Sequence, residues 1–264
     1  MQMKGNKHIK RDENATKIFD DRSLSKDYRN LIQILKPGMT ILDIGCGTGS
    51  ISKDIANTIG PNGKVIAIDN TEIFIKSGKE SYQSVSNLEL IAVDLFEYNP
   101  DTKFDLIVSA RTLQWLSNPK EALIKMKSLL KPNGQISILD YDHTNLIWNP
   151  LPPESMQEFY KTFLKWRADA GMNNKIGEDL PQLLKEAGFH SIEKINSDEA
   201  YHNEDSGFKS KIGIWSKVAD SSQMVEEGYL DNELRLKTIE EYNNWIENSA
   251  ISMTMKLNEV RGKL

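Results

Sequence analysis

Apolar and polar positions along the chain predict strands and helices in turn. Apolar residues at helical spacing over residues 24–35 end at Pro37-Gly38, and short apolar runs then alternate with amphipathic stretches of helix length. The strand-like runs are 39–44, 64–68, 88–93, 104–109 and 135–139, and the helical stretches are 50–59, 71–84 and 119–130. Strands alternating with helices indicate right-handed crossovers and a parallel sheet covered on both faces.

The pattern changes after Leu139. Residues 141–177 combine prolines with a helical stretch rich in aromatic residues, and residues 206–247 are typical of further helices. Helix and strand patterns return at 180–187 and 190–195, and the tail over 251–258 alternates strictly, as a strand with one buried face does. We therefore expect an α/β fold with a doubly wound sheet. Its expected parts are an N-terminal helical segment (1–36), a sheet core (37–140), and a helical cap with the remaining strands (141–264).

Composition and charge narrow the class of protein. The 264 residues allow one large domain, or one domain with an insertion. The net charge of -5 argues mildly against a nucleic-acid partner, and the single cysteine excludes an intrachain disulfide. The first residues lack the apolar stretch of a secretory signal, and no apolar run approaches the ~20 residues that span a bilayer. We expect a cytoplasmic protein that binds neither membrane nor nucleic acid.

A glycine-rich turn follows the first predicted strand. Gly45, Gly47 and Gly49 alternate with single residues, so a ligand can approach the backbone closely. Dinucleotide sites use Gly-x-Gly-x-x-Gly/Ala, whereas here the third glycine comes one residue early and Ser50 occupies the last position. Asp43 would repel a diphosphate and favour a cation. The turn therefore predicts a cofactor with an ammonium or sulfonium group, and a purely structural turn is the alternative.

Acidic residues end the second and third predicted strands. Asp69 lies about twenty residues beyond the last glycine, where a carboxylate can accept ribose hydroxyls. Its alternative role is to cap the helix that follows Asn70. Asp94 can accept the exocyclic amine of adenine while the backbone N–H of Leu95 contacts a ring nitrogen, and a surface turn is the alternative there.

Together these residues resemble class I S-adenosylmethionine-dependent methyltransferases. Residues 42–49 are similar to the first signature of that family, 104–110 to its fourth strand, and 129–134 to the turn before its fifth strand, with Asn133 replacing a glycine. The resemblance implies a Rossmann-like, seven-stranded, mostly parallel sheet with an antiparallel last strand. It also implies S-adenosyl-L-methionine as cofactor and S-adenosyl-L-homocysteine as product. The cofactor-binding residues that it implies are Asp43, Gly45, Cys46, Gly47, Gly49, Asp69, Asn70, Asp94, Leu95 and Ser109.

The residues after the fourth predicted strand bear on the methyl acceptor. Leu113-Gln114-Trp115-Leu116 resembles the small-molecule branch, which is methyltransferase type 11-like and includes ubiquinone/menaquinone, biotin-pathway and trans-aconitate enzymes. That resemblance implies in-line methyl transfer to a small molecule in a capped, largely apolar pocket. Arg111, Gln114 and Trp115 are the candidate substrate-binding residues, and for Trp115 a core position is the alternative.

No catalytic group stands out in the sequence. His143 is a candidate general base because imidazole titrates near neutral pH, and Tyr141 is a second candidate. A solvated loop histidine is the alternative for His143. Asp140, Asp142 and His143 are neighbours in sequence, which does not make a ligand set, so we expect no metal. Cys46 is expected to be a small loop residue and not a nucleophile.

Two other functions stay open at this point. One is a methyltransferase that acts on RNA or protein, which would need an open, basic face. The other is a protein that binds S-adenosylmethionine without catalysis. Neither the oligomeric state nor the identity of the acceptor follows from the sequence.

Overall fold

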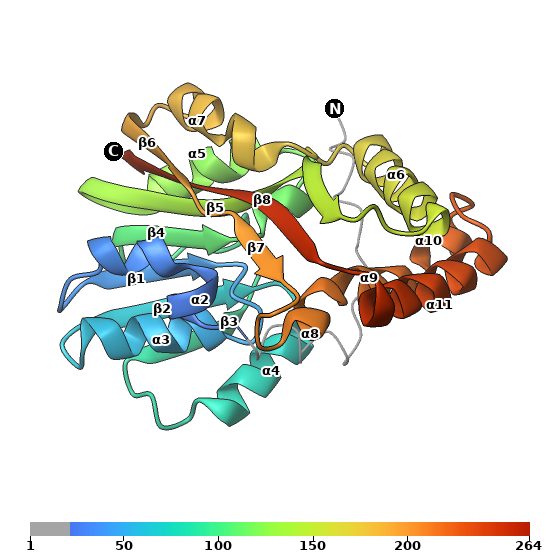
Figure 1. Cartoon of the computed structure of the whole chain (residues 1–264). Coiled ribbons are helices and arrows are strands. Elements are labelled where there is room, and N and C mark those ends of the chain that lie inside the picture. Colours follow the sequence, from blue (N-terminus) through green and yellow to red (C-terminus); the bar gives the residue numbers. More distant parts are fainter. Residues whose placement is uncertain (1–21) are drawn as a thin grey trace. The chain divides into compact units, whose positions relative to one another are not determined.

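The computed structural model describes residues 22–264, which fall into two compact units. The sheet unit contains residues 22–140, Ile176–Ser197 and Asn258–Leu264, and the helical unit contains Tyr141–Lys175 and Asp198–Leu257. Strands β5 (Leu130–Asn149) and β8 (Ser252–Lys263) each continue from one unit into the other (Figure 1). Most of the expected N-terminal segment, residues 1–21, lies outside the described residues.

The strands of the sheet unit follow the order β3-β2-β1-β4-β5-β8-β6. Their bounds are β1 Thr40–Ile44, β2 Lys64–Asp69, β3 Leu88–Ala92, β4 Phe104–Ala110 and β6 His190–Asn196. Strand β1 pairs in parallel with β2 and β4, β2 with β3, and β4 with β5, whereas β6 and β8 are antiparallel. The predicted fold class is confirmed. The predicted number of strands is too low, because a short strand, β7 (Glu199–His202), also pairs with β8 and is too short to give an alternating pattern.

Helices cover both faces of this sheet. They are α2 Leu24–Asp27, η1 Arg29–Ile34, α3 Ser50–Ile59, α4 Glu72–Ser81, η2 Leu113–Trp115, α5 Pro119–Leu129 and α7 Ile176–Glu186. The single helix predicted over 24–35 is wrong, because Tyr28 leaves the helical conformation (φ -146°, ψ 41°) and separates α2 from the 3-10 helix η1. The Tyr28 hydroxyl donates to the carbonyl oxygen of Ser137, 2.7 Å away, and this buried contact prevails over the weak preference of a short segment for a continuous helix.

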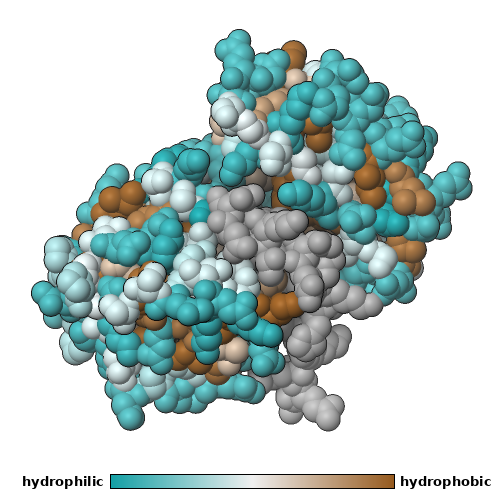
Figure 2. Space-filling model, turned by 90° about the horizontal axis from the view of Figure 1, so that it is seen from below, coloured by the Kyte–Doolittle hydropathy of each residue, from teal (hydrophilic) through white to brown (hydrophobic). Residues whose placement is uncertain are grey.

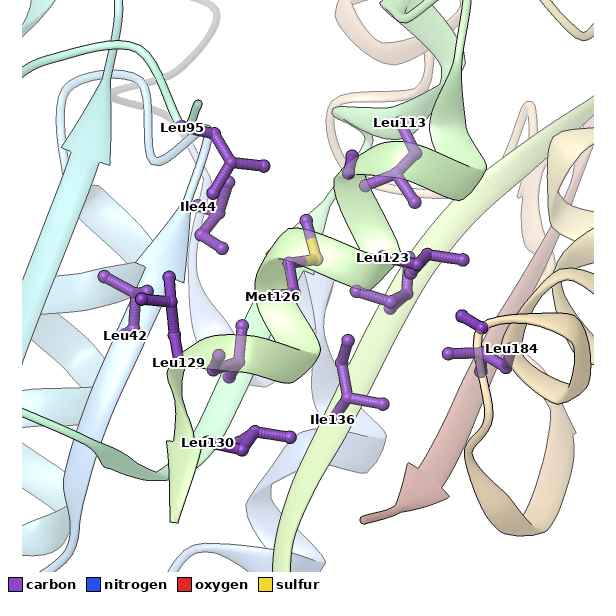
Figure 3. Close-up of a cluster of buried hydrophobic side chains, with 14 of the residues drawn as sticks. Leu42, Ile44, Leu95, Leu113, Leu123, Met126, Leu129, Leu130, Ile136 and Leu184 are labelled. Atoms are coloured by element: carbon purple, nitrogen blue, oxygen red, sulfur yellow. The ribbon is translucent and has the colours of Figure 1, made fainter. Parts of the chain in front are cut away.

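Alternate side chains of each strand serve opposite faces of the sheet. Leu42 and Ile44 of β1 belong to a buried apolar cluster with Leu123 and Met126 of α5 and Leu184 of α7 (Figure 3). Asp43 lies between them in sequence and bonds to α3 on the opposite face. Full burial of each large aliphatic side chain stabilises the fold by about 1.5–3 kcal/mol, so this cluster holds α5 and α7 against the sheet.

Strand β5 is longer than its predicted range. The prediction over 135–139 covers only the centre of the observed strand, Leu130–Asn149. On the N-terminal side, the observed strand includes Pro132-Asn133-Gly134, which are residues typical of a turn. Asn133 takes a left-handed conformation there (φ 65°). On the C-terminal side, Asp142, His143 and Asn145 interrupt the apolar pattern, although the backbone stays extended.

The helical unit is built around α11 (Asn232–Asn248), which packs against α6 (Glu154–Asp169) and α9 (Ile214–Asp220). The shorter helices are α8 Phe208–Ile212 and α10 Gln223–Glu226. Aromatic rings fill its interior: Trp215 of α9 lies 4.8 Å from Tyr160 and 5.6 Å from Phe163, between ring centroids. The helices predicted over 206–247 are present. Most aromatic side chains of α6, α8, α9 and α11 are buried, so they form the core of this unit.

The face seen in Figure 2 is mostly hydrophilic, with separate small apolar patches. Within residues 22–264, no helix combines the length and the apolar character that crossing a membrane requires.

Candidate functional site

The turn between β1 and α3 depends on its glycines. Gly45, Gly47 and Gly49 have φ values of 73°, 59° and 84°, in the left-handed region that other residues enter only with strain. The backbone N–H groups of Gly45 and Cys46 donate to the carbonyl oxygen of Ile68, at 2.8 and 3.1 Å. The turn is thereby fixed to the end of β2, and its backbone conformation is defined before any ligand binds.

Close contacts hold this turn between two other elements. A Cβ atom added to Gly45 would lie 2.1 Å from Oγ1 of Thr112, which follows β4. A Cβ atom added to Gly78 of α4 would lie 2.0 Å from the carbonyl oxygen of Thr48, in the turn itself. Gly78 was not predicted as a site residue from the sequence. An isolated glycine inside a helical pattern nevertheless indicates close packing, which is the signal that could have found it.

Asp69 lies at the end of β2 and connects the turn to α4. Its Oδ2 accepts the N–H of Gly47 at 3.0 Å, and its Oδ1 accepts the N–H of Thr71 at 2.9 Å. The side chain is buried. A carboxylate has about four acceptor positions, so both oxygens can take further donors such as ribose hydroxyls. The helix-capping alternative is wrong, because Thr71 is the N-cap of α4 and Asp69 bonds to the N–H of Thr71 and not to one within the helix.

The other residues expected to bind cofactor lie at the ends of neighbouring strands. Asp94 is half-buried after β3, and its Oδ1 accepts the N–H of Phe96 at 2.8 Å. Leu95 is buried and Asn70 is exposed. Ser109 is fully buried near the end of β4, and its hydroxyl donates to the carbonyl oxygen of Ile44 at 2.8 Å. The sheet thus brings these polar side chains to its carboxyl edge.

A small recess opens beside the glycine turn. It is lined by Arg22, Asp43, Gly45, Cys46, Ser50, Ile51 and Ala110. Burial raises the pKa of Asp43 to about 6, against a hydrogen bond from Ser52 that favours the charged form. Burial also raises the pKa of the Cys46 thiol, and the carboxylates of Asp43 and Asp69 add to that effect. A thiol in this state is a poor nucleophile at neutral pH, in keeping with the expected role of Cys46.

The candidate substrate residues of the sheet unit contact protein groups. Arg111 is buried in a left-handed conformation (φ 59°), and its Nη2 donates to the carbonyl oxygen of Asp27 at 3.0 Å. Gln114 is also buried; its Nε2 donates to the carbonyl oxygen of Arg111 at 3.0 Å, and its backbone N–H donates to Asp140 at 3.0 Å. Trp115 is half-buried. Arg111 therefore holds the N-terminal segment against the loop after β4, and substrate binding by these residues stays a prediction.

His143 lies in the aromatic interior of the helical unit. Its ring centroid is 5.1 Å from that of Tyr141, 6.0 Å from Phe163 and 6.1 Å from Trp215. The alternative of a solvated loop histidine is wrong, because packing against these rings buries the imidazole. Burial, with a smaller effect of the Arg167 charge, lowers the pKa of His143 well below its usual value. The imidazole is consequently neutral at neutral pH.

The acidic residues near His143 have other partners. Asp142 accepts hydrogen bonds from the backbone N–H and hydroxyl of Thr144, at 2.9 and 2.6 Å, and from Asn145 at 2.6 Å. Asp140 belongs to the sheet unit, where it accepts the N–H of Gln114. In the part of the chain that the structure describes, no three His, Cys, Asp or Glu side chains are grouped so that they could hold a metal ion.

Sequence comparisons relate this chain to methyltransferases. Residues 35–205 match a family model described as a methyltransferase domain. The chain is 28% identical over 200 residues to the demethylmenaquinone methyltransferase of Listeria monocytogenes, covering 70% of this chain and 84% of that protein. It is 42% identical over 96 residues to malonyl-[acyl-carrier protein] O-methyltransferase 2 of Ilyobacter polytropus, covering 36% of this chain and 37% of that relative.

Solved structures share the fold. An S-adenosylmethionine-dependent methyltransferase from Aquifex aeolicus superposes with a TM-score of 0.54 at 24% identity, covering 73% of this chain and 93% of that chain. A phosphoethanolamine N-methyltransferase 2 from Haemonchus contortus, solved with phosphomonomethylethanolamine and S-adenosylhomocysteine, superposes with a TM-score of 0.55 at 16% identity. That match covers 95% of this chain and 52% of the other.

Proposed function

This chain belongs to the methyltransferase domain family and is an S-adenosylmethionine-dependent methyltransferase, and on that basis we propose that it methylates a small-molecule acceptor. Two of its relatives are named for a quinone precursor, demethylmenaquinone, and for a malonyl group carried by a protein. Both names support a small acceptor group in preference to a nucleic acid. The acidic net charge of -5 supports the same choice.

The observation that carries this proposal is the set of acidic groups around the glycine turn. Asp43 lines the recess beside Gly45, and the buried Asp69 carboxylate ends the next strand. A diphosphate would be repelled by two carboxylates at this edge, whereas a cofactor with cationic groups and a ribose is attracted by one and can donate hydroxyls to the other. The residues present therefore fit S-adenosylmethionine.

The chain's own residues supply binding and orientation for the reaction. Bound S-adenosylmethionine would contribute a methyl group activated by a sulfonium. Gly45 to Gly49 allow a ligand to approach the backbone, Asp43 attracts the cationic end, and Asp69 and Asp94 accept hydrogen bonds from ribose and adenine. Holding an acceptor and a methyl group in line can lower a barrier by about 7–11 kcal/mol without a covalent intermediate.

Activation of the acceptor is a separate step, for which His143 and Tyr141 of the helical unit are the candidate groups. The lowered pKa of His143 makes its imidazole a weak base, so it suits an acceptor whose own proton is acidic, such as a quinol-like or 1,3-dicarbonyl-like compound. The names of two relatives point to the same two classes of acceptor.

Methyl transfer can be tested directly with a panel of acceptors. The purified protein is incubated with S-adenosylmethionine and a menaquinol precursor analogue, a malonyl thioester, bulk tRNA or a protein extract, and formation of S-adenosylhomocysteine is measured. We expect turnover with at least one of the two small acceptors and background levels with tRNA. Turnover with tRNA or protein alone would contradict the proposal, as would cofactor binding without turnover on any acceptor.

A further inference from the structure

Among the described residues, Asp43 has one polar partner, Ser52. The Ser52 hydroxyl, which is fully buried in α3, donates to Oδ2 of Asp43 at 2.6 Å. Across residues 22–264, no other hydrogen bond or ion pair reaches this carboxylate. Asp43 also lines the recess beside the glycine turn, so its carboxylate is within reach of a ligand bound there.

The surroundings of Asp43 disfavour its charge. The side chain is only 5% exposed, and the Asp69 carboxylate at the end of β2 adds repulsion. The other titratable groups that face it are the Cys46 thiol in the turn and the Tyr28 hydroxyl between α2 and η1, which are both neutral at neutral pH. Of the described residues that line the recess, Arg22 alone carries a positive charge. The Ser52 hydrogen bond therefore opposes burial and like-charge repulsion.

We propose that Ser52 is a positioning residue for the methyl donor: its hydroxyl holds the Asp43 carboxylate through Oδ2, in the charge state and orientation in which Asp43 acts on the cationic end of the cofactor. The inference rests on the proposed function, since it requires that this cofactor binds at the turn. Ser52 itself contacts no ligand in this account. Its effect reaches the cofactor only through the charge and orientation of Asp43.

A dependence of cofactor affinity on pH follows from this arrangement. With its pKa raised to about 6, Asp43 is charged above that pH and takes up a proton below it, so affinity should fall as pH decreases. The free energy of a hydrogen bond to a charged acceptor corresponds to a shift of about one to two units in the pKa of that acceptor. In Ser52→Ala the loss of affinity should consequently begin about one to two pH units higher than in the unmodified protein.

The experiment measures dissociation constants of S-adenosylmethionine for the unmodified protein and for Ser52→Ala between pH 5.5 and 8.5. The ratio of the two constants at each pH cancels titration of the ligand's own amine. We expect a ratio near 1 at pH 8.5 that rises to about 10–100 as the pH falls. The same ratio for 5′-methylthioadenosine, which lacks the amino-acid part, should not vary with pH.

Two further variants separate positioning from general damage. Ser52→Thr retains the hydroxyl and should return the pH profile toward that of the unmodified protein. Ser109→Ala removes a buried hydroxyl that donates to the Ile44 carbonyl and not to a carboxylate, so its ratio should be independent of pH. A constant ratio for Ser52→Ala, or an equal pH effect on 5′-methylthioadenosine, would overturn the inference. Failure of the unmodified protein to bind S-adenosylmethionine at pH 8.5 would instead contradict the proposed function.

Discussion

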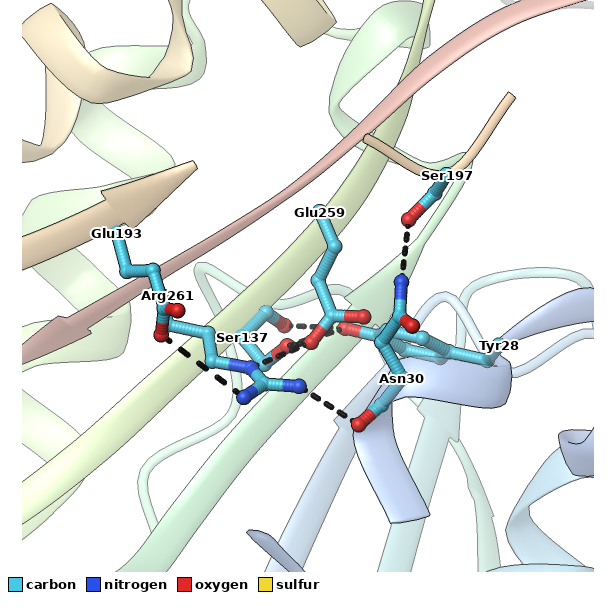
Figure 4. A network of polar contacts seen from close by, with 7 residues as sticks. All are labelled: Tyr28, Asn30, Ser137, Glu193, Ser197, Glu259 and Arg261. Atoms are coloured by element: carbon cyan, nitrogen blue, oxygen red, sulfur yellow. Dashed lines mark hydrogen bonds and ion pairs between the residues drawn. The ribbon is translucent and has the colours of Figure 1, made fainter. Parts of the chain in front are cut away.

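Replacing Arg261 with methionine should lower the free energy of unfolding by about 3–5 kcal/mol, because it leaves a buried carboxylate without its charged partner. Nε of Arg261 donates to Oε1 of Glu259 at 2.7 Å, and the Glu259 side chain is 1% exposed (Figure 4). Ser137 donates to the same oxygen at 2.9 Å, and Tyr28 donates to the Ser137 hydroxyl at 3.0 Å. Arg261 also donates to the backbone of Asn30 at 2.6 Å, so the network fixes the N-terminal helices to the sheet.

Urea unfolding at two pH values tests this interpretation. Burial raises the pKa of Glu259 above its value in the unfolded chain. Ionisation of Glu259 therefore lowers the free energy of unfolding as the pH rises through the folded-state pKa. Removing Arg261 raises that pKa further, and the destabilisation should be larger at pH 8 than at pH 5. Glu193→Gln is the control, because Glu193 lies 4.0 Å from the Arg261 guanidinium and is 64% exposed, and it should cost less than about 1 kcal/mol. Similar effects of the two variants would contradict this account.

Asp69→Ala should weaken S-adenosylmethionine binding by about 1.5–3 kcal/mol, or about 10–150-fold in dissociation constant, the usual size for a hydrogen bond to a charged group. The substitution removes the acceptor proposed for the ribose hydroxyls. It also removes the acceptor for the N–H groups of Gly47 and Thr71, so the glycine turn loses one of its attachments to the end of β2 and keeps the two backbone hydrogen bonds to Ile68. Titration calorimetry gives the change in affinity.

Asp105→Ala is a matched control for that measurement. Asp105 accepts the backbone N–H of Thr40 at 2.8 Å, where β1 begins, so it performs a similar structural task at the opposite edge of the sheet. Its loss should reduce stability and leave cofactor affinity within about twofold. Equal losses of affinity in the two variants would show that the effect of Asp69 is general destabilisation and not ligand contact.

Local patterns in the sequence were enough to predict most of the sheet unit. Helix α3 has its predicted bounds, 50–59, because the glycine before it and the glycine after it both limit the helix. The acids Asp43, Asp69 and Asp94 could be placed at one edge because parallel strands all end there. These inferences need only the order of residues along a strand and the topology of crossovers.

Features that depend on residues distant in sequence could not be predicted. Tyr28, Ser137 and Glu259 form one network although more than a hundred residues separate each from the next. The burial of His143 likewise depends on Trp215, which the chain brings to it from a later helix. Strand β5 exceeds its predicted end because pairing and packing keep the backbone extended through polar residues that locally favour turns.

A structure determined with S-adenosylhomocysteine tests the central claim most directly. We expect the ligand at the carboxyl edge of the sheet unit, with its amino-acid end beside Asp43 and Gly45, its ribose hydroxyls on Asp69 and its adenine next to Asp94. A ligand bound elsewhere, or one whose ribose does not contact Asp69, would contradict this assignment of the cofactor site.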